Sequence, residues 1–340
     1  MATERPVSLR DIAAALGISE ATVSLALNNR PTSARTRERI LKYAAEVGYS
    51  PNPLARGLAT NRTLTIGLVC PDTENPYYGS FVRGINDHAE AAGYSLFLAL
   101  SGYDAKREAT LIQALVDRKV DGIIVLPLDL PRNDRIDINR ITRLGVPIIF
   151  GSSFYEGFEP RTVMSDYEGG SYALTHHMLQ HGHRSLWYLV TEDASAPVAA
   201  MRIDGYRRAY HEAELEPEAT WIISCEGRNS AEAAYQRTRE LLRSRVRPDG
   251  ILSMNDYMAF GVLRALHELQ IEVPDEVSVA GYDDVFYASI TNTSLTTVRQ
   301  DIDAISARCV RRLLRAIEEP TSSGGLDLIA TQLVVRNSTR

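Results

Sequence analysis

The sequence predicts an all-α head followed by a two-lobed α/β core of parallel sheets. Two observations predict it: no strand pattern occurs before residue 63, and apolar runs alternate with amphipathic helical stretches after it. A chain of 340 residues is long enough for two or three domains of about 100–200 residues each. The expected boundaries are 1–50 for the head, 51–62 for a hinge helix and linker, 63–162 plus 292–319 for the first lobe, and 163–291 plus 320–340 for the second.

The head contains three predicted helices, each preceded by a serine that suits the N-cap position. Ser8, Ser19 and Ser33 are these residues, and Gly17 and Gly48 can supply the left-handed turns that end the first and third helices. The first two helices are expected to run to Ala15 and from Glu20 to Leu27, and the third to bury Ile40, Leu41, Ala44 and Val47.

A helix, a glycine turn and a second capped helix are typical of the helix-turn-helix motif, whose second helix enters the major groove of DNA. At about 100° per residue, Val23 and Leu27 face the core and Leu25 faces outward. The expected DNA contacts of this helix are Ser19, Glu20, Ala21, Thr22, Ser24, Leu25 and Asn28. A plain three-helix bundle without DNA contact is the alternative.

The charge distribution fits DNA contact at one end of the chain. Residues 1–62 carry nine Lys/Arg and five Asp/Glu, a net charge of +4, which leaves −10 for the remainder of a chain with a total of −6. The N-terminus lacks the apolar stretch of a signal peptide, and no apolar run reaches about 18 residues, so a cytoplasmic protein without membrane contact is expected. Cys70, Cys225 and Cys309 lack metal-ligand spacing and are expected to be buried thiols.

The core is predicted from alternating strands and helices, which indicate parallel sheets with right-handed crossovers. The expected strands are 64–69, 95–100, 122–126, 146–151, 186–190, 221–224, 250–254 and 277–281, and the helices are roughly 78–92, 104–118, 134–144, 168–181, 199–214, 230–245 and 256–269. These strands fit one sheet or two, and the irregular stretch 151–161 favours two lobes. A tail with a strand at 295–298, a helix at 301–317 and a strand at 328–335 can return through the first lobe and end in the second.

Short motifs occur in one order along nearly the whole chain, from about residue 7 to 336. In the head they are VSLRDIA, GISEATVS, TRERI and GYSPNP; in the core they are TIGLV, NPYY, VDGII, GHR, RIDGY, ND, AGYDD and LTTV. Together they resemble the LacI/GalR family of bacterial repressors. The resemblance implies a periplasmic-binding-protein-like core that binds a small-molecule effector between its lobes.

The resemblance also implies which head residues read DNA. The base-reading positions of the family correspond to Glu20, Ala21 and Leu25; a carboxylate can accept from a cytosine amine, and a leucine can contact a thymine methyl. The stretch 53–59 resembles the family's hinge helix, which pairs with a second copy in the minor groove, and Arg56 and Leu58 are its expected contacts. A plain linker is the alternative.

Polar and aromatic residues that follow the predicted strands are candidates for the effector site, because ligands of parallel sheets bind outside the carboxyl ends of the strands. The expected effector-binding residues are Asp72, Tyr77, Tyr78, Ser152, Arg202, Asn255, Asp283 and Gln300. Each has the alternative role of a helix cap or a polar bridge. Ser152 stands where many sugar-binding members have an acid, and 228–230 where many have an aromatic residue, which argues against a typical hexose and leaves another polyol, an acidic sugar or a different kind of effector open.

The expected function is a repressor that binds a pseudo-palindromic operator as a homodimer and responds to a sugar or a related metabolite, without a cofactor, metal or catalytic residue. The chain has no GxGxxG, Walker or GxSxG motif that would favour an enzyme. A solute-binding protein of the same fold, or a regulator that works through a protein corepressor, remains the alternative. The histidines 176, 177, 181 and 183 could suggest a metal, but a packed helix end explains them better.

Overall fold

The computed structural model describes residues 7–27, 31–49, 62–128, 145–155, 157–191, 194–225, 230–243, 247–319 and 324–340. The chain forms two compact units, Met1–Thr63 and Leu64–Arg340, and each is described by itself. The predicted linker 51–62 lies outside the described residues except for Arg62, as does the predicted helix 134–144.

The first unit contains three short helices around a small core: α1 (Leu9–Leu16), α2 (Glu20–Leu27) and α3 (Ala34–Glu46). Ser8 and Asp11 form a reciprocal capping box at the start of α1, and Gly17 ends it with φ 66°. Ile12, Val23 and Ile40 have no exposed surface and join the three helices. The prediction that Leu41 packs in this core is wrong, because its side chain is 44% exposed.

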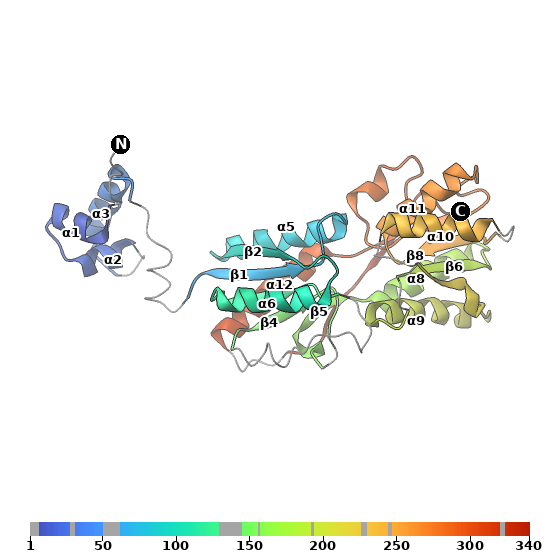
Figure 1. The fold of residues 1–340 in the computed structure, drawn as a ribbon, viewed down its shortest axis with the longest axis horizontal. Helices are drawn as coiled ribbons and strands as arrows, with labels where there is room; N and C mark the ends of the chain where they lie inside the picture. Colours follow the sequence, from blue (N-terminus) through green and yellow to red (C-terminus); the bar gives the residue numbers. More distant parts are fainter. Residues whose placement is uncertain are drawn as a thin grey trace. The chain divides into compact units, whose positions relative to one another are not determined.

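The first lobe of the second unit contains a six-stranded parallel sheet in the order β11-β5-β4-β3-β1-β2. Figure 1 labels β1, β2, β4 and β5 of this sheet. Its strands are β1 (Thr65–Cys70), β2 (Ser95–Leu100), β3 (Gly122–Val125), β4 (Ile148–Gly151), β5 (Thr162–Ser165) and β11 (Asp327–Ile329). The helices α5 (Pro76–Ala91) and α12 (Ile302–Glu318) pack on one face of this sheet and contact each other, and α6 (Ala105–Asp117) packs on the other face. Two glycines permit close packing: a Cβ on Gly67 would meet Leu115 of α6, and one on Gly122 would meet Leu313 of α12.

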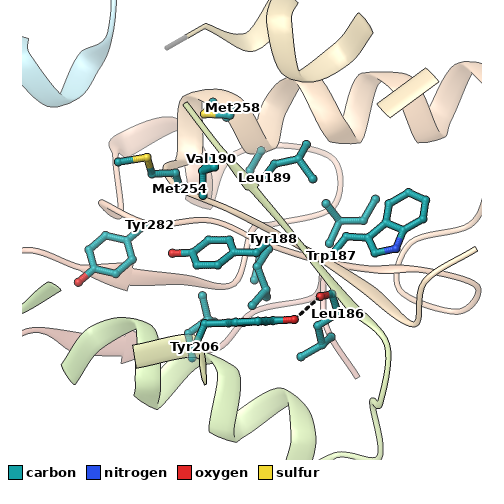
Figure 2. Packing of buried hydrophobic residues seen from close by; sticks show 14 of the residues in the cluster. Leu186, Trp187, Tyr188, Leu189, Val190, Tyr206, Met254, Met258 and Tyr282 are labelled. Atoms are coloured by element: carbon teal, nitrogen blue, oxygen red, sulfur yellow. Dashed lines mark hydrogen bonds between the residues drawn. The ribbon is translucent and has the colours of Figure 1, made fainter. Parts of the chain in front are cut away.

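The second lobe contains a four-stranded parallel sheet in the order β7-β6-β8-β9. Its strands are β6 (Leu186–Val190), β7 (Ile222–Ser224), β8 (Gly250–Ser253) and β9 (Ser278–Ala280). The helices pack as the pairs α8 (Tyr167–Gln180) with α9 (Pro197–Glu212), and α10 (Ala231–Leu242) with α11 (Asp256–Glu268). Figure 2 shows part of the buried cluster around β6, where the Tyr206 hydroxyl donates to the Leu186 carbonyl at 2.8 Å.

The C-terminal tail connects the two lobes and divides differently from the prediction. The single predicted strand 328–335 is two strands: β11 extends the first sheet beside β5, and β12 (Gln332–Val334) pairs antiparallel with β10 (Thr297–Arg299). The tail therefore contributes to the first sheet before it reaches the second lobe. Since β5 also belongs to the first sheet, the predicted lobe boundary at 162/163 lies too early, and the assignment of all of 320–340 to the second lobe is wrong.

Short single-turn helices complete the described fold: η2 (Glu159–Arg161), η3 (Ala219–Trp221) and η4 (Phe286–Ser289). The three cysteines are free and buried, as expected. None of the described helices has both the length and the apolar character that a membrane crossing requires.

Candidate effector site and DNA-binding head

The second head helix, α2, presents a distinct outer surface. Val23 and Ala26 are buried against the other helices, whereas Glu20, Ala21 and Leu25 are exposed. Leu25 is 37% exposed, a large apolar side chain that the head itself leaves uncovered. The prediction that Val23 faces inward and Leu25 outward is confirmed.

The hydroxyls near the start of α2 serve the helix itself. Ser19 accepts from the Thr22 backbone N–H at 3.1 Å, and the two hydroxyls share a hydrogen bond of 2.8 Å. This is an N-cap arrangement, so Ser19 fixes where α2 begins. Ser24 is half-buried on the same helix. The remaining predicted contacts, Asn28, Arg56 and Leu58, lie outside the described residues.

A small cavity lies in the second unit, at the carboxyl ends of strands from both lobes. Its lining includes six of the eight predicted effector residues, namely Tyr77, Tyr78, Ser152, Arg202, Asn255 and Asp283, together with Asn75, Pro127, Ser153, Tyr167, Val198 and Met254. Its volume is about 50 Å³, whereas ligand pockets usually measure about 300–1,000 Å³. A sugar-sized ligand can therefore enter only if side chains move or the lobes separate.

Hydroxyl groups from three elements meet on one side of this cavity. Tyr77 of α5 shares a 2.8 Å hydrogen bond with Ser152, and the Tyr167 hydroxyl donates to the Ser152 carbonyl at 2.7 Å. Tyr77 reaches this position because Asn75 caps α5 by accepting from the Tyr77 N–H at 3.0 Å. Burial raises the pKa of both tyrosines, so they are neutral hydroxyls that can donate or accept.

Asp283 supplies the carboxylate of the cavity and follows β9. Its backbone has φ 119°, and Gln300 donates to its Oδ1 at 2.6 Å. Burial raises the pKa of Asp283 to about 7, although Arg202 and the Gln300 hydrogen bond act in the opposite direction. The raised pKa favours the protonated form of this acid, which can donate as well as accept a hydrogen bond.

The strained loop at Asp283 is held by its neighbours. Asp284, with φ 56°, is bound by Arg336 at 2.6 Å and by Arg299 at 2.7 Å. Asp256 accepts from the Val285 N–H at 2.8 Å and from the Thr297 hydroxyl at 2.6 Å. These bonds tie the loop to α11 and to the tail, so Asp283 keeps an unusual conformation that costs free energy.

Arg202 of α9 carries the positive charge of the cavity. Its guanidinium carbon lies 4.2 Å from the ring centre of Tyr167 and 4.4 Å from that of Tyr282. Its exposed fraction is only 5%. Cation–π contacts of this kind stabilise a cation but leave its N–H groups free to donate in the plane of the guanidinium.

Two predicted effector residues do not line the cavity. Asp72 accepts from the N–H groups of Glu74 and Asn75 at 2.8 and 3.0 Å, so its side chain shapes the turn before α5. Gln300 lies behind the cavity wall, where it accepts from Ser165 at 2.6 Å and donates to Asp283. Asn255 lines the cavity and also caps α11 by accepting from Met258 N–H at 2.8 Å.

Tyr167 is the principal residue that sequence reasoning missed. It opens α8 two residues after β5, the strand that the prediction also missed. If Thr162–Ser165 had been identified as a strand, the rule that ligands bind beyond strand ends would have nominated Tyr167.

The histidines near the end of α8 have structural contacts. His183 is buried, bonded to the Met178 carbonyl at 2.9 Å and to the Ser278 hydroxyl at 2.8 Å, and burial lowers its pKa. The rings of His177 and His181 contact each other at a tilt of 45°, with centres 4.2 Å apart. No group of three or more potential ligands in the described part of the chain is arranged to hold a metal ion.

Comparisons with known proteins agree with both units. The model of bacterial regulatory proteins of the lacI family matches residues 8–52, and that of the periplasmic binding protein-like domain matches residues 175–339. The transcriptional regulator DegA of Bacillus subtilis (strain 168) is 31% identical over 333 residues, covering 98% of each chain. The transcriptional repressor PurR of Pasteurella multocida (strain Pm70) is 27% identical over 336 residues, again covering 98% of each.

A crystal structure of the Lac repressor dimer bound to operator and the anti-inducer ONPF has a TM-score of 0.85 to this chain, at 28% identity, and covers 98% of this chain and 99% of that one. The head helices, the two parallel sheets and these relatives lead to one conclusion. The chain belongs to the LacI family of bacterial transcription regulators.

Proposed function

We propose that this protein is a repressor that binds a pseudo-palindromic operator as a homodimer and is controlled by a small polar molecule in the cavity. The observation that carries the proposal is the presence, in one chain, of a helix-turn-helix with an exposed α2 surface and of a small polar cavity at strand ends of two lobes. The Lac repressor, bound to operator and to an anti-inducer in its crystal structure, supports the combination.

On DNA, the exposed residues of α2 would enter the major groove. Glu20 would accept from a cytosine amine and Leu25 would contact a thymine methyl, while Thr22 and Ser24 would lie against phosphates. Asn28, Arg56 and Leu58 remain predicted contacts.

Pairing of two chains would bring two heads to one site. Large apolar side chains stay exposed on the core: Phe97 and Leu98 on the edge strand β2, and Phe286, Tyr287 and Ile290 at and after η4. Exposed apolar clusters of this kind mark interaction surfaces, and we propose that a second copy covers them.

Effector control would follow from the small size of the cavity. Because about 50 Å³ is too small for a sugar, binding would change the arrangement of the lobes or of the side chains between them. Couplings of about 1–3 kcal/mol between two sites are typical. Arg202, Asp283 and the tyrosines would serve binding and not catalysis, in a protein that acts on DNA in the cytoplasm.

The test is selection of genomic DNA fragments by the purified full-length protein at one stated salt concentration. The expected result is enrichment of fragments that share one palindromic sequence. The double variant Glu20→Ala, Leu25→Ala removes the two side chains proposed to contact bases, and it should lose the preference for this sequence. Equal recovery of all fragments by the unaltered protein would contradict the proposal.

A further inference from the structure

The guanidinium of Arg202 is buried without a hydrogen-bonded partner. No described residue forms a hydrogen bond or ion pair with its side chain, and its Nε has neither a partner among these residues nor solvent contact. The ring centres of Tyr167 and Tyr282 lie 4.2 and 4.4 Å from its Cζ and 6.0 Å from each other, so the two rings cover adjacent sides of the guanidinium and leave its other side for a ligand. A buried charge without an ionic partner is costly to desolvate, which makes an anion a favourable addition.

The two charged groups of the described cavity lining do not form an ion pair with each other. Among the described lining residues, Asp283 is the one acid and Arg202 the one cation. Asp283 and Arg202 lie beyond ion-pair distance, and the Asp283 carboxylate is instead bonded by Gln300. Position 152, next to the strand end of β4, holds a serine and adds no negative charge.

Neutral polar groups complete the surroundings. The Ser153 hydroxyl is buried with no hydrogen-bond partner among the described residues, and the hydroxyls of Tyr77 and Ser152 lie at the same cavity. Such groups bind hydroxyls or the second oxygen of a carboxylate. They supply donors and acceptors for a hydroxyl-rich frame next to a single anionic group.

We propose that the effector is a polyhydroxy compound that carries one carboxylate, and that Arg202 binds this carboxylate. The inference rests on the proposed role of the cavity as the effector site and specifies its ligand class. A carboxylate carries one negative charge and matches one guanidinium bidentately. A phosphate ester carries nearly two charges, which would leave an excess negative charge beside Asp283.

The test uses glycolate, which is small enough for the existing cavity, and its neutral analogue glycolamide. Affinities for the full-length protein are measured from thermal unfolding in ligand titrations at constant ionic strength. We expect glycolate to bind at least about tenfold more tightly than glycolamide, because hydrogen bonds between charged partners are about twice as strong as neutral ones. Equal affinities, or no glycolate binding, would overturn the proposal.

Two substitutions on the same helix locate the effect. Arg202→Gln should abolish the preference for glycolate. Arg208→Gln is the matched control: Arg208 also lies over a tyrosine ring, 4.1 Å from the centre of Tyr172, but it is exposed and paired with Glu168 at 2.6 Å. This variant should keep the preference. A preference that survives Arg202→Gln would contradict the assignment.

Two further arms complete the design. Inorganic phosphate should bind more weakly than glycolate, and tighter phosphate binding would overturn the choice of a carboxylate. Asp283→Asn, which removes the competing acid, should strengthen glycolate binding, and it tests the site independently if Arg202→Gln fails to fold. Selection of DNA fragments with the unaltered protein and with each variant distinguishes the two proposals. Failure of the unaltered protein to select an operator refutes the repressor function, whereas the glycolate titrations alone decide the ligand class.

Discussion

A buried carboxyl on α6 gives the core a pH dependence that can be calculated. Glu108 has no exposed surface; it accepts from the Tyr155 hydroxyl and from the backbone N–H of Leu128, and its Oε2 has no partner among the described residues. These contacts join α6 to the segments after β3 and β4, which also provide Pro127 and Ser152 to the cavity. Burial without a nearby cation raises the pKa of Glu108 from 4.5 to about 8.

The sign of the effect follows from proton linkage. Between pH 4.5 and about 8, the folded protein keeps a proton that the unfolded chain has lost. The free energy of unfolding therefore falls by about 1.4 kcal/mol per pH unit across this interval and is independent of Glu108 above it. The whole interval amounts to about 5 kcal/mol, and about 70% of the loss has occurred by pH 7.

Glu108→Gln should remove this slope, because the amide keeps an acceptor oxygen for Tyr155 and Leu128 and does not titrate. Urea denaturation of both proteins at half-unit steps from pH 5.5 to 9 measures the difference, which should grow in favour of the variant up to about pH 8 and then stay constant. Glu90→Gln, an exposed carboxyl on α5, controls for the lost charge. A constant difference between Glu108→Gln and the unaltered protein over the whole pH range would refute the reasoning.

Four further predictions test other parts of the account. Gly205→Ala should destabilise the core by about 1–3 kcal/mol in urea denaturation, since its Cβ would lie 2.8 Å from the Tyr172 backbone nitrogen where α9 crosses α8. An unchanged free energy of unfolding would mean that these helices can move apart at little cost in free energy. Leu313→Ala should cost about 2–5 kcal/mol in the same assay, because this fully buried side chain packs over Gly122, and a loss below 1 kcal/mol would contradict that packing. Ser8→Ala should lower the stability of the head by about 1 kcal/mol, measured by helix melting, and Ser8→Thr should restore most of it. Leu25→Ala should reduce operator affinity by about five- to tenfold where a thymine faces this residue, with unchanged head stability; an unaltered base preference would remove the thymine assignment.

Strong local patterns predicted most of the elements. The bounds of α2, β2 and β6 coincide with the expected 20–27, 95–100 and 186–190, because capping serines and unbroken apolar runs mark them. β5 was missed because Thr162 and Ser165 make a fully buried strand look like a loop. Their hydroxyls are satisfied by the Phe158 carbonyl and by Gln300, partners that local sequence cannot reveal.

The candidate site was predictable where residues follow strands and not where it depends on distant contacts. Tyr77, Ser152 and Asp283 were expected on this rule and line the cavity. Asp72 obeys the same rule but bonds its own turn, since an aspartate can bond backbone N–H groups two or three residues on. The packing of Arg202 against the rings of Tyr167 and Tyr282 joins residues from separate parts of the chain, and no local pattern predicts such a contact.

The most direct test of the central claim is a binding titration with a selected operator and with the same operator carrying five extra base pairs at its centre. Five base pairs turn one half-site to the opposite side of the duplex, since a helical turn takes about 10–10.5 base pairs. If two heads of one dimer read the site together, two chains bind the selected operator in one step, and the insertion weakens binding by about 100-fold or more. Equal affinity for the two DNAs, with one chain bound to each, would contradict the account.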